Sequence, residues 1–170
     1  LNFANLKKVN NRILTAARML GVKTIIWGEC GHAWRAGIFT PALSGPMDEW
    51  APPYPYHISQ FIVDMMRRGA LNGKIDKSAN DDYLVTYHDP CNSARAGQLI
   101  EEPREIIRAC CNRFVEMPAD TIREKTFCCG AGNGLLTDEI MPIRMAGGKP
   151  RALAVKQTGA FWAVVNEPPA

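Results

Sequence analysis

The chain has 170 residues, of which 46% are hydrophobic and 22% charged, and its formal net charge is +3. This is the composition of a soluble globular protein, and it excludes an intrinsically disordered chain. The net charge is too small to indicate a nucleic-acid-binding protein. No apolar run is long enough to span a bilayer, and polar and basic residues interrupt the first apolar stretch, so no signal peptide is expected.

The first half of the chain predicts two helices and one strand. Residues 6–20 place apolar side chains on one stripe at helical spacing, and Gly21 is a stop signal. Residues 24–27 form a short apolar run that fits a strand buried on both faces. Residues 38–56 are rich in proline and aromatic residues, which excludes regular structure and predicts a lid or a loop packed over the core. Residues 57–68 predict the second helix.

The second half contains the strongest strand signal, residues 83–88, which are rich in β-branched and aromatic side chains. A helix is expected to open at Pro103 and to run to residue 114. A last helix is expected over residues 149–158 and a last strand over residues 161–165. Because helix and strand signals alternate, we predict an α/β fold with a largely parallel sheet flanked by helices.

Six cysteines are the most informative feature of the composition. They lack the spacing of a small disulfide-stapled domain, and heavy cysteine use without an export signal indicates metal or redox chemistry. Cys30 and Cys91 stand alone, each just after a predicted strand. The carboxyl ends of parallel strands meet at one edge of a sheet, so both cysteines are expected at the same rim. For Cys30, a buried structural role stays an equal alternative.

Cys128 and Cys129 lie in a turn that continues with Gly130, Gly132 and Gly134. A glycine-rich turn can present several backbone N–H groups to an anionic group. Thiolates bind iron, and N–H donors to the sulfurs tune the reduction potential, so this turn favours an iron–sulfur cluster. Zinc stays open as an alternative, because four thiolates also satisfy that ion.

The other cysteines and the histidines have structural interpretations. Cys110 and Cys111 continue the apolar stripe of a predicted helix and are expected to fill the core. His57 opens a predicted helix and His88 ends a predicted strand, and both are expected to be structural. His32 lies close to the first lone cysteine, but a role in the site is not favoured.

Two motifs resemble those of a known family. The chain reads Tyr87-His88-Asp89-Pro90-Cys91 and, further on, Phe127-Cys128-Cys129-Gly130-Ala131-Gly132. These motifs and the interval between them resemble the cysteine-rich CCG domain of heterodisulfide reductases and related iron–sulfur oxidoreductases. Together with residues 28–35, they are most similar to one branch, the K subunit of the membrane complex associated with dissimilatory sulfite reductase.

The resemblance extends over residues 1–170 as one CCG-type domain. Residues 1–80 correspond to part of a first half, which includes the lid-like loop, and residues 81–170 to the second half with the Cys-Cys-Gly motif. The chain does not begin with Met, and we expect it to be a fragment of a longer protein.

The family resemblance implies a noncubane 4Fe–4S cluster as cofactor. Cys91, Cys128 and Cys129 match metal ligands of the family and are the expected catalytic residues, while Gly130 is expected to line the cofactor. The family also has a later Cys-x-x-Cys motif, but no cysteine follows Cys129 here. Cys30 is therefore the best local candidate for a further ligand.

The resemblance implies an iron–sulfur oxidoreductase of the disulfide reductase type in anaerobic sulfur metabolism. Electrons would pass between a quinone-linked membrane complex and a disulfide or trisulfide on a small sulfur-carrier protein. The expected partners are that carrier and other subunits of the complex, with the chain in the cytoplasm and attached to the membrane through its partners. Two alternatives stay open: a reductase of heterodisulfides between small thiol cofactors, and a zinc-binding or structural module.

Overall fold

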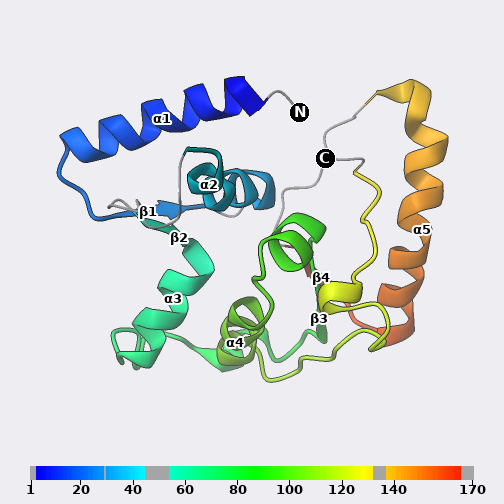
Figure 1. Cartoon of the computed structure of the whole chain (residues 1–170). Helices are drawn as coiled ribbons and strands as arrows, with labels where there is room; N and C mark the ends of the chain where they lie inside the picture. The colour runs from blue at the N-terminus through cyan, green and yellow to red at the C-terminus, as the bar shows by residue number, and fades with distance from the viewer. Residues whose placement is uncertain (1–2, 29, 45–53, 132–136, 166–170) are drawn as a thin grey trace.

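The computed structural model describes residues 3–28, 30–44, 54–131 and 137–165 (Figure 1). Within these residues, helices accompany short strands that pair in parallel, so the predicted mixed α/β class is confirmed. The strands of this part of the chain form two two-stranded sheets, and the expected single larger sheet is not found. Hydrophobic patterns predict where strands occur, but they do not reveal which strands pair.

The first sheet joins β1 (Thr24–Trp27) to β2 (Tyr54–His57), with Thr24 opposite Tyr54. The strand predicted over residues 24–27 is confirmed, but its expected burial on both faces is wrong. Exposed and half-buried residues alternate along β1, and Ile26 is 44% exposed. Since successive side chains point to opposite faces of a strand, only one face of β1 is packed.

Two of the helices beside this sheet confirm the predicted helices of the first half. α1 (Phe3–Met19) is followed by Gly21, whose φ is +67° and whose N–H donates to the Arg18 carbonyl. A glycine in this left-handed conformation is a common helix terminator. α3 (Ile58–Arg67) is capped by His57, whose side chain accepts a hydrogen bond from the first turn of the helix.

The structure corrects the expectation for residues 38–56. Prolines do not exclude regular structure there, because α2 (Gly31–Ser44) continues through Pro41 and Pro55 lies in β2. β2 pairs on one side only in the described part of the chain, so a proline without an N–H need not break a hydrogen-bonded ladder. Residues 45–53 lie outside the described residues, and the expected lid stays a prediction.

The second sheet joins β3 (Val85–His88) to β4 (Trp162–Val165), which confirms both predicted strands. All four residues of β3 are buried. On the side of β3 away from β4, the Val85 N–H donates to the Arg113 carbonyl, and the Val115 N–H donates to the Val85 carbonyl, both at 2.9 Å. β3 is therefore flanked on both sides and is the best-buried strand of the described residues.

Two further helices accompany this sheet. α4 (Glu101–Cys110) ends before the predicted residue 114, because the residues that follow it pair with β3. α5 (Met141–Thr158) begins well before the predicted start at residue 149. Two consecutive glycines and Pro150 interrupt the helical pattern of the sequence, yet the helix runs through all three.

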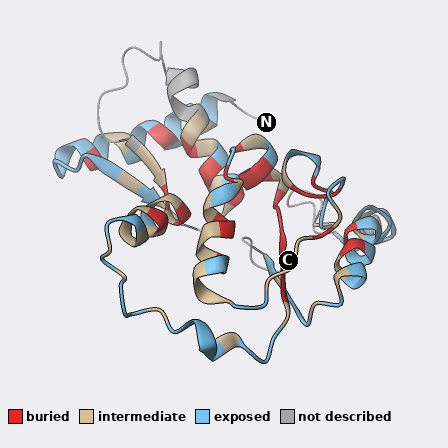
Figure 2. Cartoon of the chain, turned by 90° about the horizontal axis from the view of Figure 1, so that it is seen from below, coloured by how far each residue is buried: buried red, intermediate tan, exposed pale blue. Residues whose placement is uncertain are grey.

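Buried residues gather around β3 and the loop at its carboxyl end, whereas α1 and α5 are mostly exposed (Figure 2). One apolar cluster contains Val85, Tyr87 and Ile107, and a second contains Met117, Ile122 and Ala154. Among the described helices, none combines the length and the apolar character needed to cross a bilayer.

Candidate functional site

The cysteines of the predicted site follow β1, follow β3 and occupy the glycine-rich turn. Cys30 lies between β1 and α2, and Cys91 opens a single turn of π-helix, η3 (Cys91–Ala96), directly after β3. All six cysteines of the chain lie within the described residues, and none of them is in a disulfide bond. Cys30 and Cys91 are half-buried, while Cys128 and Cys129 are exposed. The vicinal pair is therefore open to an approaching group.

Hydrogen bonds join the loop of Cys30 to the loop of Cys91. The Arg35 guanidinium donates to the Asn92 Oδ1 at 3.3 Å, and the His32 Nε2 lies 3.0 Å from the Asn92 Nδ2. His32 and Arg35 lie in the first turns of α2, directly after Cys30, whereas Asn92 follows Cys91. The two loops are therefore neighbours in space.

Close packing of α2 on η3 supports this arrangement. The indole N–H of the buried Trp34 donates to the Gly97 carbonyl at 3.0 Å. A Cβ atom at position 97 would lie 2.5 Å from the Trp34 ring, so any side chain larger than hydrogen would clash there. Gly97 thus permits the contact that holds α2 beside η3.

The segment that carries the vicinal pair is tied to the segment that carries Cys91. The Thr126 hydroxyl donates to the backbone carbonyl of Asp89 at 2.6 Å, and both residues are buried. Thr126 lies two residues before Cys128, and Asp89 lies two residues before Cys91. This hydrogen bond fixes the two cysteine-bearing segments relative to each other.

The Asp89 side chain is the centre of a buried charge network. Both of its oxygens accept hydrogen bonds from the Arg104 guanidinium, at 2.7 and 2.6 Å, and the backbone N–H of Arg123 donates to it at 2.8 Å. Arg104 also donates to Glu116 at 2.8 Å. Burial by itself lowers the pKa of Arg104, but its hydrogen bonds to the two carboxylates outweigh that effect and raise it. Arg104 therefore keeps its positive charge, and its hydrogen bonds to Asp89 hold the residues before Cys91.

The turn presents a backbone donor to a cysteine sulfur, as its glycines predict. Gly130 has a φ of +93°, and its N–H donates to the Cys128 Sγ at 3.4 Å. N–H donors of this kind stabilise a negatively charged sulfur. Gly132 and Gly134 lie outside the described residues.

The four cysteines of the predicted site are the type of ligand that an iron–sulfur cluster needs. Soft thiolates are the ligands that iron–sulfur clusters use, and one of these sulfurs already accepts a backbone N–H. Within the described residues, however, no three His, Cys, Asp or Glu side chains gather into a group that could hold a metal ion. A single site formed by Cys30, Cys91, Cys128 and Cys129 stays a prediction.

The structural roles expected outside this site are confirmed for three residues. Cys111 packs against the Val85 cluster, and burial raises the pKa of its thiol. His57 is fully buried and caps α3. His88 is buried in β3, where burial, together with the nearby Arg151, lowers its pKa to about 4.

Sequence reasoning missed the residues that hold the cysteine segments in place. Arg104 and Arg151 are buried cations on helices, and Thr126 is a buried hydroxyl in an irregular segment. Charged residues on a predicted helix are usually exposed, so no signal in the sequence singles them out. Asp89 belongs to a noted motif, but the sequence does not indicate its partner.

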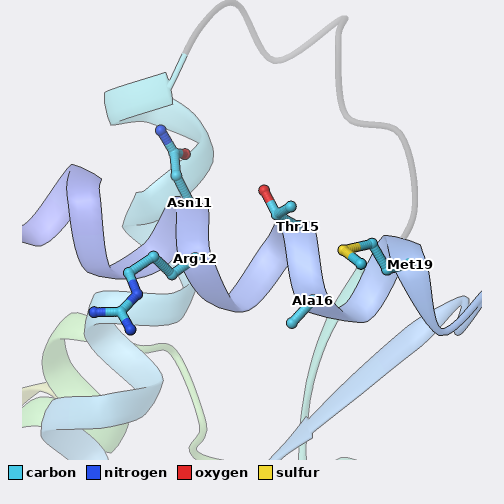
Figure 3. Close-up of a pocket in the computed structure, with 5 residues that line it drawn as sticks. All are labelled: Asn11, Arg12, Thr15, Ala16 and Met19. Carbon is cyan, nitrogen blue, oxygen red and sulfur yellow. The ribbon is translucent and has the colours of Figure 1, made fainter.

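A hollow on α1 lies apart from these residues. It is lined by Asn11, Arg12, Thr15, Ala16 and Met19 (Figure 3). None of the predicted site residues lines this hollow, so it does not belong to the candidate site.

The second half of the chain matches a known protein family. A family profile described as the cysteine-rich domain CCG matches residues 85–168. The chain is 39% identical, over 87% of its length, to the Hdr-like menaquinol oxidoreductase iron-sulfur subunit 2 of Archaeoglobus fulgidus, of which it covers 32%. It is 33% identical, over 71% of its length, to one subunit of the dihydromethanophenazine:CoB–CoM heterodisulfide reductase of Methanosarcina mazei, of which it covers 27%.

More distant similarity extends to another class of redox protein. The chain is 28% identical, over 76% of its length, to the EtfAB:quinone oxidoreductase of Syntrophomonas wolfei, of which it covers 15%. No solved structure matches the chain significantly. The chain spans about a third of the length of the Archaeoglobus relatives it matches.

Proposed function

We propose that this chain, whose residues 85–168 match the profile of the CCG cysteine-rich domain, is part of an iron–sulfur electron-transfer subunit. The relatives named for menaquinol oxidation and for heterodisulfide reduction support a redox role. We further propose that residues 1–170 form one CCG-type domain, with residues 1–80 as part of a first half and residues 81–170 as the second half.

The observation that carries this proposal is the exposed Cys-Cys-Gly turn tied to the Cys91 segment. Cys128 and Cys129 are exposed, a backbone N–H points at the Cys128 sulfur, and the Thr126–Asp89 bond anchors the turn to the residues before Cys91. Cys91, Cys128 and Cys129 are the proposed catalytic residues and ligands, Cys30 is a further ligand, and Gly130 lines the cofactor.

The proposed cofactor is a noncubane 4Fe–4S cluster, which when bound would accept and release single electrons. The proposed reaction is reduction of an S–S bond. Two electrons and two protons convert one disulfide into two thiols, and a quinol that is oxidised to a quinone supplies both electrons and both protons. The exposure of the vicinal pair supports access of a protein-borne disulfide to this region.

The proposed substrate is a disulfide or trisulfide on a small sulfur-carrier protein, in keeping with the resemblance to the K-subunit branch. The other proposed partners are subunits of a membrane-bound redox complex that would hold the chain at the cytoplasmic side of the membrane. A second candidate substrate is a heterodisulfide of two small thiol cofactors, which the similarity to the heterodisulfide reductase of Methanosarcina mazei favours. A zinc-binding or structural module is the non-redox alternative.

Anaerobic purification of the full-length protein that contains this chain tests the proposal. We expect iron and acid-labile sulfide in the purified protein, broad visible absorption, and an EPR signal after one-electron oxidation or reduction. Reduced protein mixed with the carrier disulfide, and separately with a small-molecule heterodisulfide, should reoxidise with the preferred substrate. A colourless protein with stoichiometric zinc and no acid-labile sulfide would overturn the iron–sulfur assignment.

A further inference from the structure

The face of α5 that lies against the cysteine turn has an unusual composition. Arg144, Gly148 and Arg151 follow one another at the spacing that puts residues on one side of a helix. Each of them contacts the segment between Thr126 and Gly130. In Figure 1, α5 runs beside the irregular segment of chain that leads into this turn. We call these three residues the α5 seat.

At the middle of the seat, the backbone of α5 touches the backbone of the turn. A Cβ atom at Gly148 would lie 2.7 Å from the Cys129 carbonyl oxygen and 3.3 Å from the Gly130 Cα. Conversely, a Cβ atom at Gly130 would lie 2.7 Å from the Arg144 carbonyl oxygen and 3.2 Å from the Gly148 Cα. Both distances of 2.7 Å are too short for real atoms, so only glycine fits on either side.

The glycine in the helix costs stability that something else must offset. Glycine within a helix is less favourable than alanine by about 0.5–1 kcal/mol. The neighbouring Gly147 has no atom within 4 Å of the position its Cβ would take, so the requirement for glycine belongs to position 148 alone. This contrast indicates that contact with the turn, and not the helix itself, sets the residue at position 148.

The two arginines hold the turn at either end. The Arg144 Nε donates to the Gly130 carbonyl at 3.1 Å. The Arg151 Nη2 donates to the Thr126 hydroxyl at 2.8 Å, and its guanidinium lies 5.6 Å from the centre of the Phe127 ring. The turn is therefore clamped to α5 immediately before and after the vicinal cysteines.

Arg151 also brings a buried positive charge to this region. Its side chain is buried, with the residue only 5% exposed, and within the described residues its guanidinium bonds go to uncharged atoms, including the Met117 sulfur. No direct ion pair in that part of the chain neutralises it. A buried cation that contacts the two residues directly before the vicinal cysteines favours an anionic centre in this region.

We propose that Arg144, Gly148 and Arg151 are positioning residues that fix the Cys128–Gly130 turn on α5 and so set the geometry in which the two vicinal thiols bind a soft metal centre. The nature of that centre rests on the proposed function. The placement of the thiols rests only on the contacts of α5 with the turn.

The decisive comparison is Gly148→Ala against Gly147→Ala. Both substitutions add one methyl group to the same helix, but only the first adds it against the turn. The readouts are iron per chain and EPR g values in the anaerobically purified full-length protein, and the affinity of the iron-free, reduced protein for phenylarsine oxide, which binds two nearby free thiols together. The Cys110→Ala, Cys111→Ala background removes the other vicinal pair from the arsenical measurement.

We expect Gly148→Ala to weaken arsenical binding by about tenfold to a hundredfold, the range for residues that orient metal ligands, and to shift the EPR signal. Gly147→Ala should match the parent in both readouts. Should Gly148→Ala fail to fold, the half-exposed Arg144 decides: Arg144→Met should weaken arsenical binding and Arg144→Lys should restore it.

Parent-like arsenical affinity in folded Gly148→Ala, or in Arg144→Met, would overturn the α5 seat. Absence of iron from the parent protein would instead refute the iron–sulfur function, and the arsenical comparison would still decide the placement of the thiols. The two failures are thus distinguishable.

Discussion

Asp89 and Arg104 form an ion pair with two parallel hydrogen bonds, and neither side chain is exposed to solvent. Fork-shaped pairing of this kind fixes both the distance and the orientation of the two groups. Because Asp89 lies two residues before Cys91 and its carbonyl accepts the Thr126 hydroxyl, the same residue holds both cysteine-bearing segments. The charge network of Asp89 and Arg104 therefore fixes the relative position of the two cysteine-bearing segments.

Replacement of Arg104 by methionine should destabilise the fold by about 3–5 kcal/mol, since it leaves the Asp89 carboxylate buried without its partner. Arg108→Met is the matched control on the same helix: Arg108 also faces Glu116, at 3.6 Å, but its side chain is 52% exposed. The control should change the free energy of unfolding by about 1 kcal/mol or less. Urea unfolding of both variants measures this, and equal losses would contradict a special role for the buried pair.

Much of the fold can be predicted from local sequence patterns. α1, α3 and β3 have strong periodicity or composition, and their positions follow from it. The start of α5 and the pairing of the strands cannot be predicted from local patterns, because they depend on contacts between distant segments. Gly148 illustrates the reason: it signals a helix break locally, yet its lack of a side chain is what lets α5 meet the cysteine turn.

The sequence predicts the cysteines of the candidate site but not the residues that anchor them. The cysteine motifs can be read directly from the sequence. The predicted ends of β1 and β3 also give the positions of Cys30 and Cys91 relative to the strands. The residues that anchor them, Arg104 and Arg151, are indistinguishable in sequence from the charged residues of a solvated helix face. Only the three-dimensional packing reveals that these two are buried.

His88 should make stability depend on pH. Its folded pKa is about 4, lowered by burial and by Arg151 against the weaker, opposite effect of Asp89, whereas an unfolded histidine titrates at about 6.5. As pH falls from 6.5 to 4, the unfolded chain therefore binds a proton that the folded chain excludes, and stability is lost. The loss from this residue is about 2 kcal/mol at pH 5, and no such effect operates above about pH 7.

Urea unfolding at pH 7 and pH 5 tests this dependence. His88→Gln, which cannot take up a proton, should lose less stability than the parent between the two pH values. Carboxylates titrate in both proteins, so the difference between them isolates the histidine. Identical losses in the two proteins would mean that His88 does not titrate as its burial implies.

Cys110 and Cys111 should prove to be packing residues. Cys111 packs against the cluster of Val85 and Ile107, and partial burial raises the pKa of its thiol, which disfavours the thiolate that metals bind. The double replacement by alanine should leave iron content unchanged and cost about 1 kcal/mol or less per residue. Loss of iron from the double variant would place this pair among the ligands.

Serine replacements of the four predicted ligands test the site itself. A hydroxyl is a poorer donor to iron than a soft thiolate, so Cys128→Ser or Cys129→Ser should reduce cluster occupancy and abolish S–S turnover. Cys110→Ser, a half-buried cysteine away from the turn, is the control and should do neither. His57→Ala, which the sequence alone would suggest as a control, is unsuitable because this buried residue caps α3.

Cys30→Ser is the most informative member of this series. Cys30 directly precedes α2, and the contacts of His32 and Arg35 with Asn92 hold that helix beside the turn that begins at Cys91. If Cys30 is a ligand, Cys30→Ser should lose iron as Cys128→Ser does. If it only lines the site, iron should stay while the EPR signal or the reduction potential shifts. Unchanged iron, spectrum and turnover would remove Cys30 from the site, and the remaining ligands would then have to come from outside these 170 residues.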